Sequence, residues 1–189
     1  GTIKPVKVVL DCGNGAGGSI VRRLFNTVGL DPEILFEKPD GTFPNHEANP
    51  IDPENLKDLQ KAMKKEKADI GLAFDGDADR CFLVDENGDA VNPSALTALI
   101  AERELKRYPG SGIIHNLISS RSVKEVVEEN GGIAHRSRVG HSYIKALMAQ
   151  TGSVFGGEHS GHFYFKDFWL ADSGALAALH ALAALGKSD

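Results

Sequence analysis

Strand-like and helix-like segments alternate along almost the whole chain, and this order constrains the fold more than any other feature. Short apolar runs at residues 7–10, 70–74 and 113–117 have the length and composition of buried strands. Between them, apolar residues recur every three or four positions, as on helices that bury one face. This alternation predicts parallel strands joined by helical crossovers, and therefore an α/β fold.

The chain is long enough for two such domains. Its 189 residues are 41% hydrophobic and 25% charged, which is typical of a soluble globular protein. A hairpin signal, Asn87-Gly88, is followed by a new helix from Asn92, so we expect one domain over residues 1–91 and another over 92–189. We predict two consecutive α/β/α sandwich domains with mixed, mostly parallel sheets.

Charge and composition exclude several classes of partner. The formal net charge is -5 and the short basic run at 61–67 is typical of a solvated helix face, so we expect no nucleic-acid partner. Cys12 and Cys81 form no CxxC pair, which argues against a disulfide framework or a zinc site. We see no apolar stretch of about 20 residues and no signal-peptide pattern, and we expect a cytoplasmic protein without a membrane partner.

Three carboxylates alternate directly after the apolar run 70–74. Asp75, Asp77 and Asp79 repel one another, by about 4 kcal/mol per pair at about 4 Å and an effective dielectric of about 20, unless a cation lies among them. Mg²⁺ prefers such oxygen ligands and often also binds a substrate phosphate. The adjacent Arg80 is suited to binding phosphoryl oxygens in a bidentate manner. The segment therefore predicts a phosphoryl-transfer site.

Two other interpretations of the acidic segment stay open. The spacing of the three aspartates with Glu86 matches a calcium-binding helix-loop-helix, but Arg80 stands where that motif needs glycine and the flanking residues are strand-like. The other interpretation is an acidic surface turn between two strands.

A glycine-rich segment follows the first strand. Gly13, Gly15 and Gly18 match the fingerprint of dinucleotide-binding domains, and Glu37 supplies the acidic residue expected about 20 positions later. The alternative is that the glycines only permit a tight strand-to-helix turn. We favour the tight turn, because the other motifs indicate metal and phosphate chemistry rather than hydride transfer. The long loop at 38–50 is expected to be functional.

A polar segment with three glycines, residues 156–162, lies between two short apolar runs. Glu158, Ser160 and His162 alternate, so in an extended segment they would point to one side. A carboxylate, a hydroxyl and an imidazole side by side can bind neighbouring sugar hydroxyls, and the alternative is a glycine turn with solvated side chains. His141 precedes a helix, where it either contributes to an anion site or caps the helix.

These motifs, in this order on two α/β domains, resemble the α-D-phosphohexomutase superfamily, specifically its bacterial phosphomannomutase/phosphoglucomutase branch. The Asp-Gly-Asp-Ala-Asp-Arg segment is similar to the family's Mg²⁺ loop, and the Gly-Glu-His-Ser-Gly-His segment is similar to its sugar-recognition loop. The segments at 43–46 and 140–145 are supporting likenesses. The resemblance implies Mg²⁺ ligation by Asp75, Asp77 and Asp79, catalytic roles for Arg80 and His141, and sugar contacts by Glu158, Ser160 and His162.

The resemblance also implies an activity. Family members move phosphate reversibly between O1 and O6 of a hexose through a bisphosphorylated intermediate, and this sequence does not distinguish mannose from glucose. They have four domains, and this chain resembles the second and third. We therefore expect domains I and IV, which carry the phosphorylated serine and a phosphate-binding loop, to be absent, and the isolated chain to be inactive.

One departure from the family leaves the general acid or base unassigned. Many relatives have a lysine after the first strand of the third domain, where this sequence has His115-Asn116-Leu117. The remaining alternatives are an NAD-dependent oxidoreductase, a metal-dependent sugar-phosphate phosphatase with an aspartate nucleophile, and a non-catalytic binding module.

Overall fold

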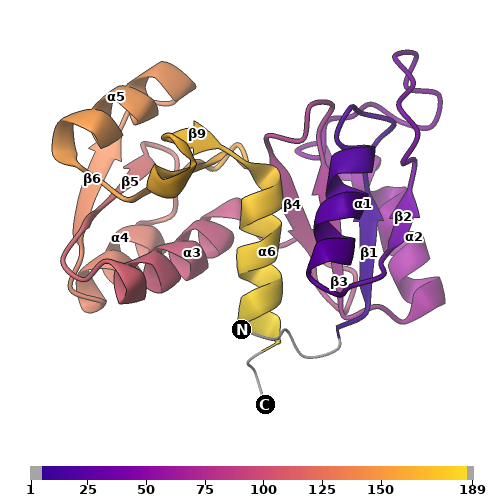
Figure 1. The fold of residues 1–189 in the computed structure, drawn as a ribbon, viewed down its shortest axis with the longest axis horizontal. Helices are drawn as coiled ribbons and strands as arrows, with labels where there is room; N and C mark the ends of the chain where they lie inside the picture. The colour runs from indigo at the N-terminus through magenta and orange to yellow at the C-terminus, as the bar shows by residue number, and fades with distance from the viewer. Residues whose placement is uncertain (1–5, 187–189) are drawn as a thin grey trace. The chain divides into compact units, whose positions relative to one another are not determined.

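The computed structural model of the protein describes residues 6–186, which form two compact units (Figure 1). The first unit contains the described residues up to Val91 and those from Gly174 onward, and the second contains Asn92–Ser173. Each unit has its own mixed sheet flanked by helices. The predicted fold of two α/β/α sandwich domains is confirmed.

A four-stranded sheet with the order β2-β1-β3-β4 forms the centre of the first unit. Its strands are β1 (Val8–Asp11), β2 (Glu33–Leu35), β3 (Ile70–Phe74) and β4 (Cys81–Val84). β1 is parallel to β2 and β3, whereas β4 is antiparallel to β3. The segments that follow β1, β2 and β3 therefore meet at one edge of the sheet, where ligands bind in open α/β sheets.

Two crossovers cover opposite faces of this sheet (Figure 1). Helix α1 (Gly18–Thr27) connects β1 to β2, and the 3₁₀ turn η1 (Pro53–Leu56) with α2 (Lys57–Glu66) leads back past β1 to β3. Right-handed crossovers in opposite directions require this placement. The core between α2 and the sheet consists of apolar residues from both: Val9, Leu56, Leu59, Met63, Ala68, Ala73, Phe82 and Val84.

The buried stripe of α1 is narrower than its apolar pattern predicts. Val21 and Phe25 are fully buried, but Ile20 and Val28 are 64% and 38% exposed. Their spacing in the sequence predicts that Ile20, Val21, Phe25 and Val28 share one buried face, and the exposure of Ile20 and Val28 shows that this prediction is wrong. The sheet contacts only the positions that lie one turn apart on the inner side of the helix.

The closing helix, α6 (Gly174–Leu185), packs with the first unit against β4. In the sequence, the Ala/Leu-rich segment 172–185 predicts a closing helix that starts at Asp172, and it falls within the predicted second domain, residues 92–189. In the structure Asp172 belongs to the two-residue strand β9 (Ala171–Asp172). The helix begins two residues later at Gly174, whose missing side chain allows the backbone to approach the Arg80 carbonyl closely.

The second unit has a five-stranded sheet with the order β6-β5-β7-β8-β9. Strand β5 (Gly112–Asn116) is parallel to β6 (Ile133–Ser137) and β7 (Phe155–Gly157), whereas β8 (Phe163–Phe165) and β9 add antiparallel pairs. A 3₁₀ turn, η2 (Lys166–Phe168), joins β8 to β9. The segments after β5, β6 and β7 again meet at one edge.

Three helices cover the two faces of this second sheet. Helix α3 (Pro93–Arg107) packs with α4 (Arg121–Glu129) on one face, and α5 (His141–Thr151) covers the other. The predicted start of α3 is confirmed, because the Asn92 side chain accepts a hydrogen bond from Ser94 N at 2.8 Å. The core under α5 contains Ile114, Ile144, Met148 and Tyr164.

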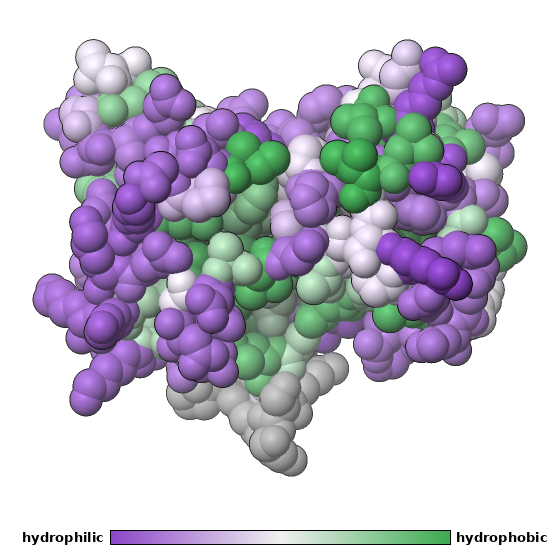
Figure 2. Space-filling view, turned by 180° about the vertical axis from the view of Figure 1, so that it is seen from behind, coloured by the Kyte–Doolittle hydropathy of each residue, from purple (hydrophilic) through white to green (hydrophobic). Residues whose placement is uncertain are grey.

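Figure 2 shows one face of the molecule, on which apolar groups form separate patches between polar side chains. Trp169 is the most exposed large apolar side chain of the described residues, at 85%. Within residues 6–186, no helix combines the length and the apolar character needed to cross a lipid bilayer.

The glycine-rich segment between β1 and α1 is covered by other loops of its own unit. A Cβ at Gly15 would lie 2.5 Å from the Gly76 carbonyl oxygen, and one at Gly18 would collide with the Glu37 carbonyl. Ala16 N also donates to the Gly76 carbonyl at 2.7 Å. The Glu37 side chain is bound by Arg22, through Nε at 2.5 Å and Nη2 at 2.7 Å. These contacts favour the tight-turn interpretation over a dinucleotide site, because the backbone that would approach a pyrophosphate is already packed.

Gly15→Ala is expected to lower the free energy of unfolding by about 1–3 kcal/mol, because the added methyl group would collide with the Gly76 backbone. Gly41→Ala is the matched control, since a Cβ there meets nothing within 4 Å. Urea denaturation of both variants measures the difference. Equal midpoints for the two variants would show that the loops are not packed as described.

The pH dependence of stability depends in part on His115. Burial in β5 lowers the pKa of its imidazole, and the charges of Arg136 and Lys124 lower it further. The unfolded chain then binds the proton more readily, so this contribution to stability is complete above about pH 6.5 and is lost as the pH falls below that value. We expect the free energy of unfolding to fall more steeply toward acid pH in the wild type than in His115→Gln. Urea titrations across this pH range measure the two slopes, and parallel slopes would contradict the assignment.

Candidate functional site

The acidic segment connects β3 to β4. Because these are antiparallel strands, the calcium helix-loop-helix interpretation is wrong. Ala78 has a left-handed backbone conformation (φ +61°), and its N–H donates to the Asp75 carbonyl at 3.1 Å. This tight turn places one carboxylate oxygen from each of Asp75, Asp77 and Asp79 within 4.8 Å of the others.

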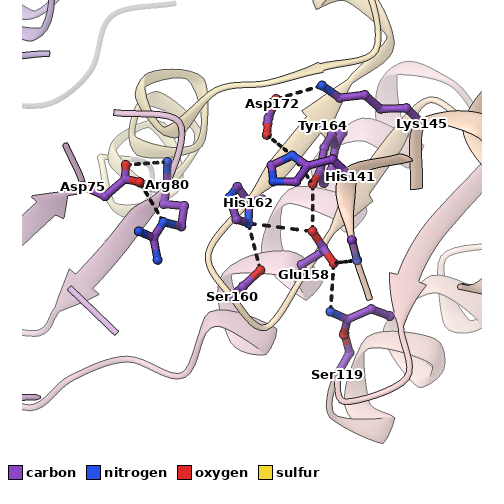
Figure 3. Close-up of polar contacts among 12 residues, drawn as sticks. Asp75, Arg80, Ser119, His141, Lys145, Glu158, Ser160, His162, Tyr164 and Asp172 are labelled. Carbon is purple, nitrogen blue, oxygen red and sulfur yellow. Dashed lines mark hydrogen bonds and ion pairs between the residues drawn. The ribbon is translucent and has the colours of Figure 1, made fainter. Parts of the chain in front are cut away.

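Arg80 binds the first of these carboxylates (Figure 3). Asp75 is 5% exposed; its Oδ1 accepts from Arg80 N at 3.1 Å and its Oδ2 from Arg80 Nε at 2.7 Å. Arg80 Nη1 also donates to Asn49 Oδ1 at 3.1 Å. The guanidinium is therefore fixed in direction, and it offsets part of the negative charge of the acidic segment.

The donor set of this turn fits a hard divalent cation. It consists of carboxylate oxygens, and Asp77 is exposed, so water or a phosphate oxygen has access. The thiols of this unit do not compete for the ion: Cys12 and Cys81 are buried, and burial raises the pKa of Cys12 to about 12. Mg²⁺ matches these ligands better than a softer metal.

The long loop at 38–50 is anchored at the same edge of the first sheet. His46 Nε2 lies 3.1 Å from Asp11 Oδ2, and Asn45 Nδ2 donates to Asn14 Oδ1 at 2.7 Å. Burial raises the pKa of Asp11, whereas His46 and a hydrogen bond from Gly13 N oppose that shift. The loop thus holds Asn49, which contacts Arg80 and which the sequence analysis did not single out.

Glu158 is the centre of the polar network in the second unit. It follows β7 and is 1% exposed. Its Oε1 accepts from Gly140 N at 3.0 Å and from Asn116 Nδ2 at 3.3 Å, and its Oε2 accepts from the Tyr164 hydroxyl at 2.7 Å. The carboxylate therefore connects the ends of β5 and β6 to β8.

Ser160 and His162 lie beside this carboxylate (Figure 3). Ser160 Oγ is 2.8 Å from His162 Nδ1, which is 3.7 Å from Glu158 Oε2. The expectation of an extended segment was wrong, because residues 158–162 form the turn of the β7–β8 hairpin, with Gly161 N donating to the Glu158 carbonyl at 3.1 Å. The turn, rather than strand alternation, brings the three predicted side chains together.

His141 begins α5 and belongs to the same network. Its Nδ1 is 2.9 Å from Asp172 Oδ2 and 3.2 Å from the Tyr164 hydroxyl. Its ring lies edge-on to that of His162, with the centroids 4.4 Å apart. The N–H of Gly140, at the N-terminus of this helix, donates to Glu158, so the negative group at this helix end is a carboxylate of the protein itself.

Sequence reasoning missed three members of this network. Asn116 ends β5, Tyr164 lies on β8 two residues after His162, and Asp172 lies on β9. The spacing of Tyr164 was a usable signal, since residues two apart on a strand point to the same side. Asp172 gave no such signal, because an aspartate shortly before an Ala/Leu helix is typical of a helix start.

Solved structures share this fold. The chain superimposes on a phosphoglucomutase/phosphomannomutase family protein from Burkholderia thailandensis with a TM-score of 0.93 and 40% identity, over 98% of this chain and 41% of that one. A second match, described as a putative phosphomannomutase from Thermus thermophilus, has a TM-score of 0.89 at 23% identity, over 98% and 43% of the two chains. The second match supports the fold alone.

Curated relatives carry related names. The chain is 42% identical over 187 residues to a phosphoglucomutase of Neisseria meningitidis, covering 98% of this chain and 41% of the relative. It is 44% identical over 187 residues to a phosphomannomutase/phosphoglucomutase of Pseudomonas putida, with 98% and 40% covered. The chain thus spans about two fifths of the length of these relatives.

Family models match both halves of the chain. Residues 2–88 match phosphoglucomutase/phosphomannomutase alpha/beta/alpha domain II, and residues 92–189 match alpha/beta/alpha domain III. The family resemblance of the motifs is confirmed by these matches. The chain therefore belongs to the phosphoglucomutase/phosphomannomutase family, of which it carries the domain II and domain III sequences.

Proposed function

We propose that this chain supplies the metal-binding and sugar-binding domains of a phosphohexomutase that moves phosphate between O1 and O6 of mannose or glucose through a bisphosphorylated intermediate. The observation that carries the proposal is that each unit gathers its predicted site residues in one turn after a strand: Asp75, Asp77 and Asp79 after β3, and Glu158, Ser160 and His162 after β7. The names of the relatives support the substrate class.

In this proposal Asp75, Asp77 and Asp79 hold Mg²⁺. The bound ion supplies positive charge that stabilises the phosphoryl oxygens during transfer. Arg80 binds the same phosphoryl group, since its guanidinium is already directed by Asp75 and Asn49. Phosphoryl transfer needs mainly positioning and charge neutralisation, which these four side chains supply.

Ser160 and His162 make the direct sugar contacts. Both are partly exposed and hydrogen-bonded to each other, so a sugar hydroxyl can join the pair at either side chain. Glu158 differs, because its two oxygens already accept from Gly140, Asn116 and Tyr164. A sugar hydroxyl can bind this carboxylate only if it replaces one of those donors. The Glu158 contact is therefore more selective for the position of the hydroxyl than the contacts of Ser160 and His162.

His141 acts in proton transfer. Nδ1 of His141 lies 2.9 Å from the Asp172 carboxylate and 3.2 Å from the Tyr164 hydroxyl, which favours a proton on Nδ1. The imidazole then carries its lone pair on Nε2 and accepts there the proton of the attacking hydroxyl. Lys145 Nζ donates to the other oxygen of Asp172 at 3.2 Å and so helps to hold that carboxylate in place. This assignment fills the acid-base role that the sequence comparison left open.

The remaining parts of the enzyme are partners in this proposal. Domains I and IV of the same protein supply the phosphorylated serine and a phosphate-binding loop, and the enzyme works in the cytoplasm. The isolated residues 1–189 are then a module that binds Mg²⁺ without turnover.

Mg²⁺ binding tests the metal assignment. We expect saturable binding to the isolated chain by isothermal titration calorimetry, weakened about tenfold, or about 1.4 kcal/mol, in Asp77→Asn, which loses one charged ligand. Glu86→Gln is the matched control, because Glu86 is needed only by the calcium-loop interpretation. Equal affinities for Asp77→Asn and wild type would refute the assignment.

A chimera tests the reaction. Residues 1–189 replace the matching 41% of the Neisseria meningitidis phosphoglucomutase, and conversion of glucose 1-phosphate and mannose 1-phosphate to the 6-phosphates is measured. We expect turnover in the chimera, none in the isolated chain, and a loss of about 10²–10⁴ in kcat for His141→Ala, the usual contribution of a general base.

His135→Ala, which removes a histidine of β6 outside the network, is the control for that loss. Equal kcat values for the two histidine variants would remove His141 from the mechanism. Phosphate release from glucose 1-phosphate by the isolated chain would instead favour the phosphatase alternative.

A further inference from the structure

Three residues of the second unit have side chains of the types that bind metal ions. His141, His162 and Asp172 each present a donor atom within 4.8 Å of those of the other two. The residues come from the start of α5, the end of the β7–β8 turn and strand β9, and Figure 3 shows their side chains directed toward one another.

The spacing within this group is close to that of metal ligands. Ligands about 2.0–2.1 Å from a tetrahedral ion lie about 3.3 Å apart. His141 Nδ1 and Asp172 Oδ2 are 2.9 Å apart, and the two imidazole centroids are separated by 4.4 Å. All three donor atoms lie within 4.8 Å of one another, so modest side-chain adjustments bring them to the spacing of ligands around one ion.

Neighbouring side chains hold two members of this group in place, and the third member is partly exposed to solvent. Lys145 Nζ lies 3.2 Å from the second oxygen of Asp172, and Ser160 Oγ lies 2.8 Å from His162 Nδ1, so both ligand side chains have hydrogen-bonded support. The side chains of Asp172 and His162 are only 10% and 14% exposed, whereas that of His141 is 47% exposed. An ion can enter past His141 and find two ligands already fixed.

The chemistry of the ligands indicates which ion. Two imidazole nitrogens with one carboxylate suit Zn²⁺, Co²⁺ or Ni²⁺, whereas Mg²⁺ prefers oxygen ligands alone.

We propose that His141, His162 and Asp172 form a site for a divalent transition metal. An ion there occupies the imidazoles that the proposed function uses for proton transfer and sugar contact. If the proposed function holds, Zn²⁺ bound at this site inhibits the enzyme at its sugar-binding domain. Only this consequence, and not the metal site itself, rests on the proposed function.

Co²⁺ titration of the isolated chain tests the site without any assay of activity. We expect one equivalent of Co²⁺ to give the visible absorption of a tetrahedral complex, and we expect Zn²⁺ but not excess Mg²⁺ to abolish it. His162→Ala and Asp172→Asn should each weaken binding at least about tenfold. His141→Ala should do the same, and its exposed side chain makes this variant the least disruptive to folding.

Two controls separate this site from other binding. His135→Ala removes a histidine elsewhere in the unit, and Asp77→Asn alters the acidic turn; both should keep the absorption band. Loss of the band in His135→Ala, or its survival in His141→Ala and His162→Ala alike, would overturn the proposal. This experiment measures metal binding and not mutase activity. A negative result would therefore overturn the metal site alone, and the chimera experiment would still decide the mutase assignment.

Discussion

The buried carboxylate of Glu158 is the constraint on which the geometry of the second unit depends. A charged group taken out of water is costly unless hydrogen bonds replace its solvation. Gly140, Asn116 and Tyr164 provide those bonds, and each comes from a different segment. Satisfying one side chain therefore holds the start of α5, the end of β5 and the strand β8 in register at one edge of the sheet. Removing one partner of a buried charge typically costs about 3–5 kcal/mol, which makes the arrangement cooperative.

In the first unit, close backbone packing holds separate segments together at one edge of the sheet. Gly15 lies against the backbone of Gly76, so the turn after β1 and the acidic turn support each other without side chains between them. Arg80 then ties the acidic turn to the loop after β2 through Asn49. Three segments that are distant in sequence are held as one rigid edge, and rigidity of this kind is what a metal and phosphate site needs.

The sequence predicted the order of elements well, because period and turn residues are local signals. Asn92 capping α3 and the Asp-Gly-Asp-Ala-Asp-Arg turn between β3 and β4 needed no tertiary information. What failed depended on packing partners: Ile20 and Val28 carry the right periodicity but face solvent, and Asp172 pairs in a strand instead of starting a helix. Motifs in the sequence predicted the candidate site residues, whereas the contacts of Asn116 and Tyr164 with Glu158 are visible only in the folded sheet.

The backbone at Gly140 limits how this protein can diversify. Gly140 has a φ of +121°, and its N–H donates to Glu158. A residue with a Cβ would be strained in that backbone conformation, so position 140 favours glycine. Substitutions near His141 are therefore restricted at one place: the side chains around it can be varied, but residue 140 has to remain glycine if its N–H is to reach Glu158. A redesign of this edge of the sheet has more freedom in its side chains than in the peptide at position 140.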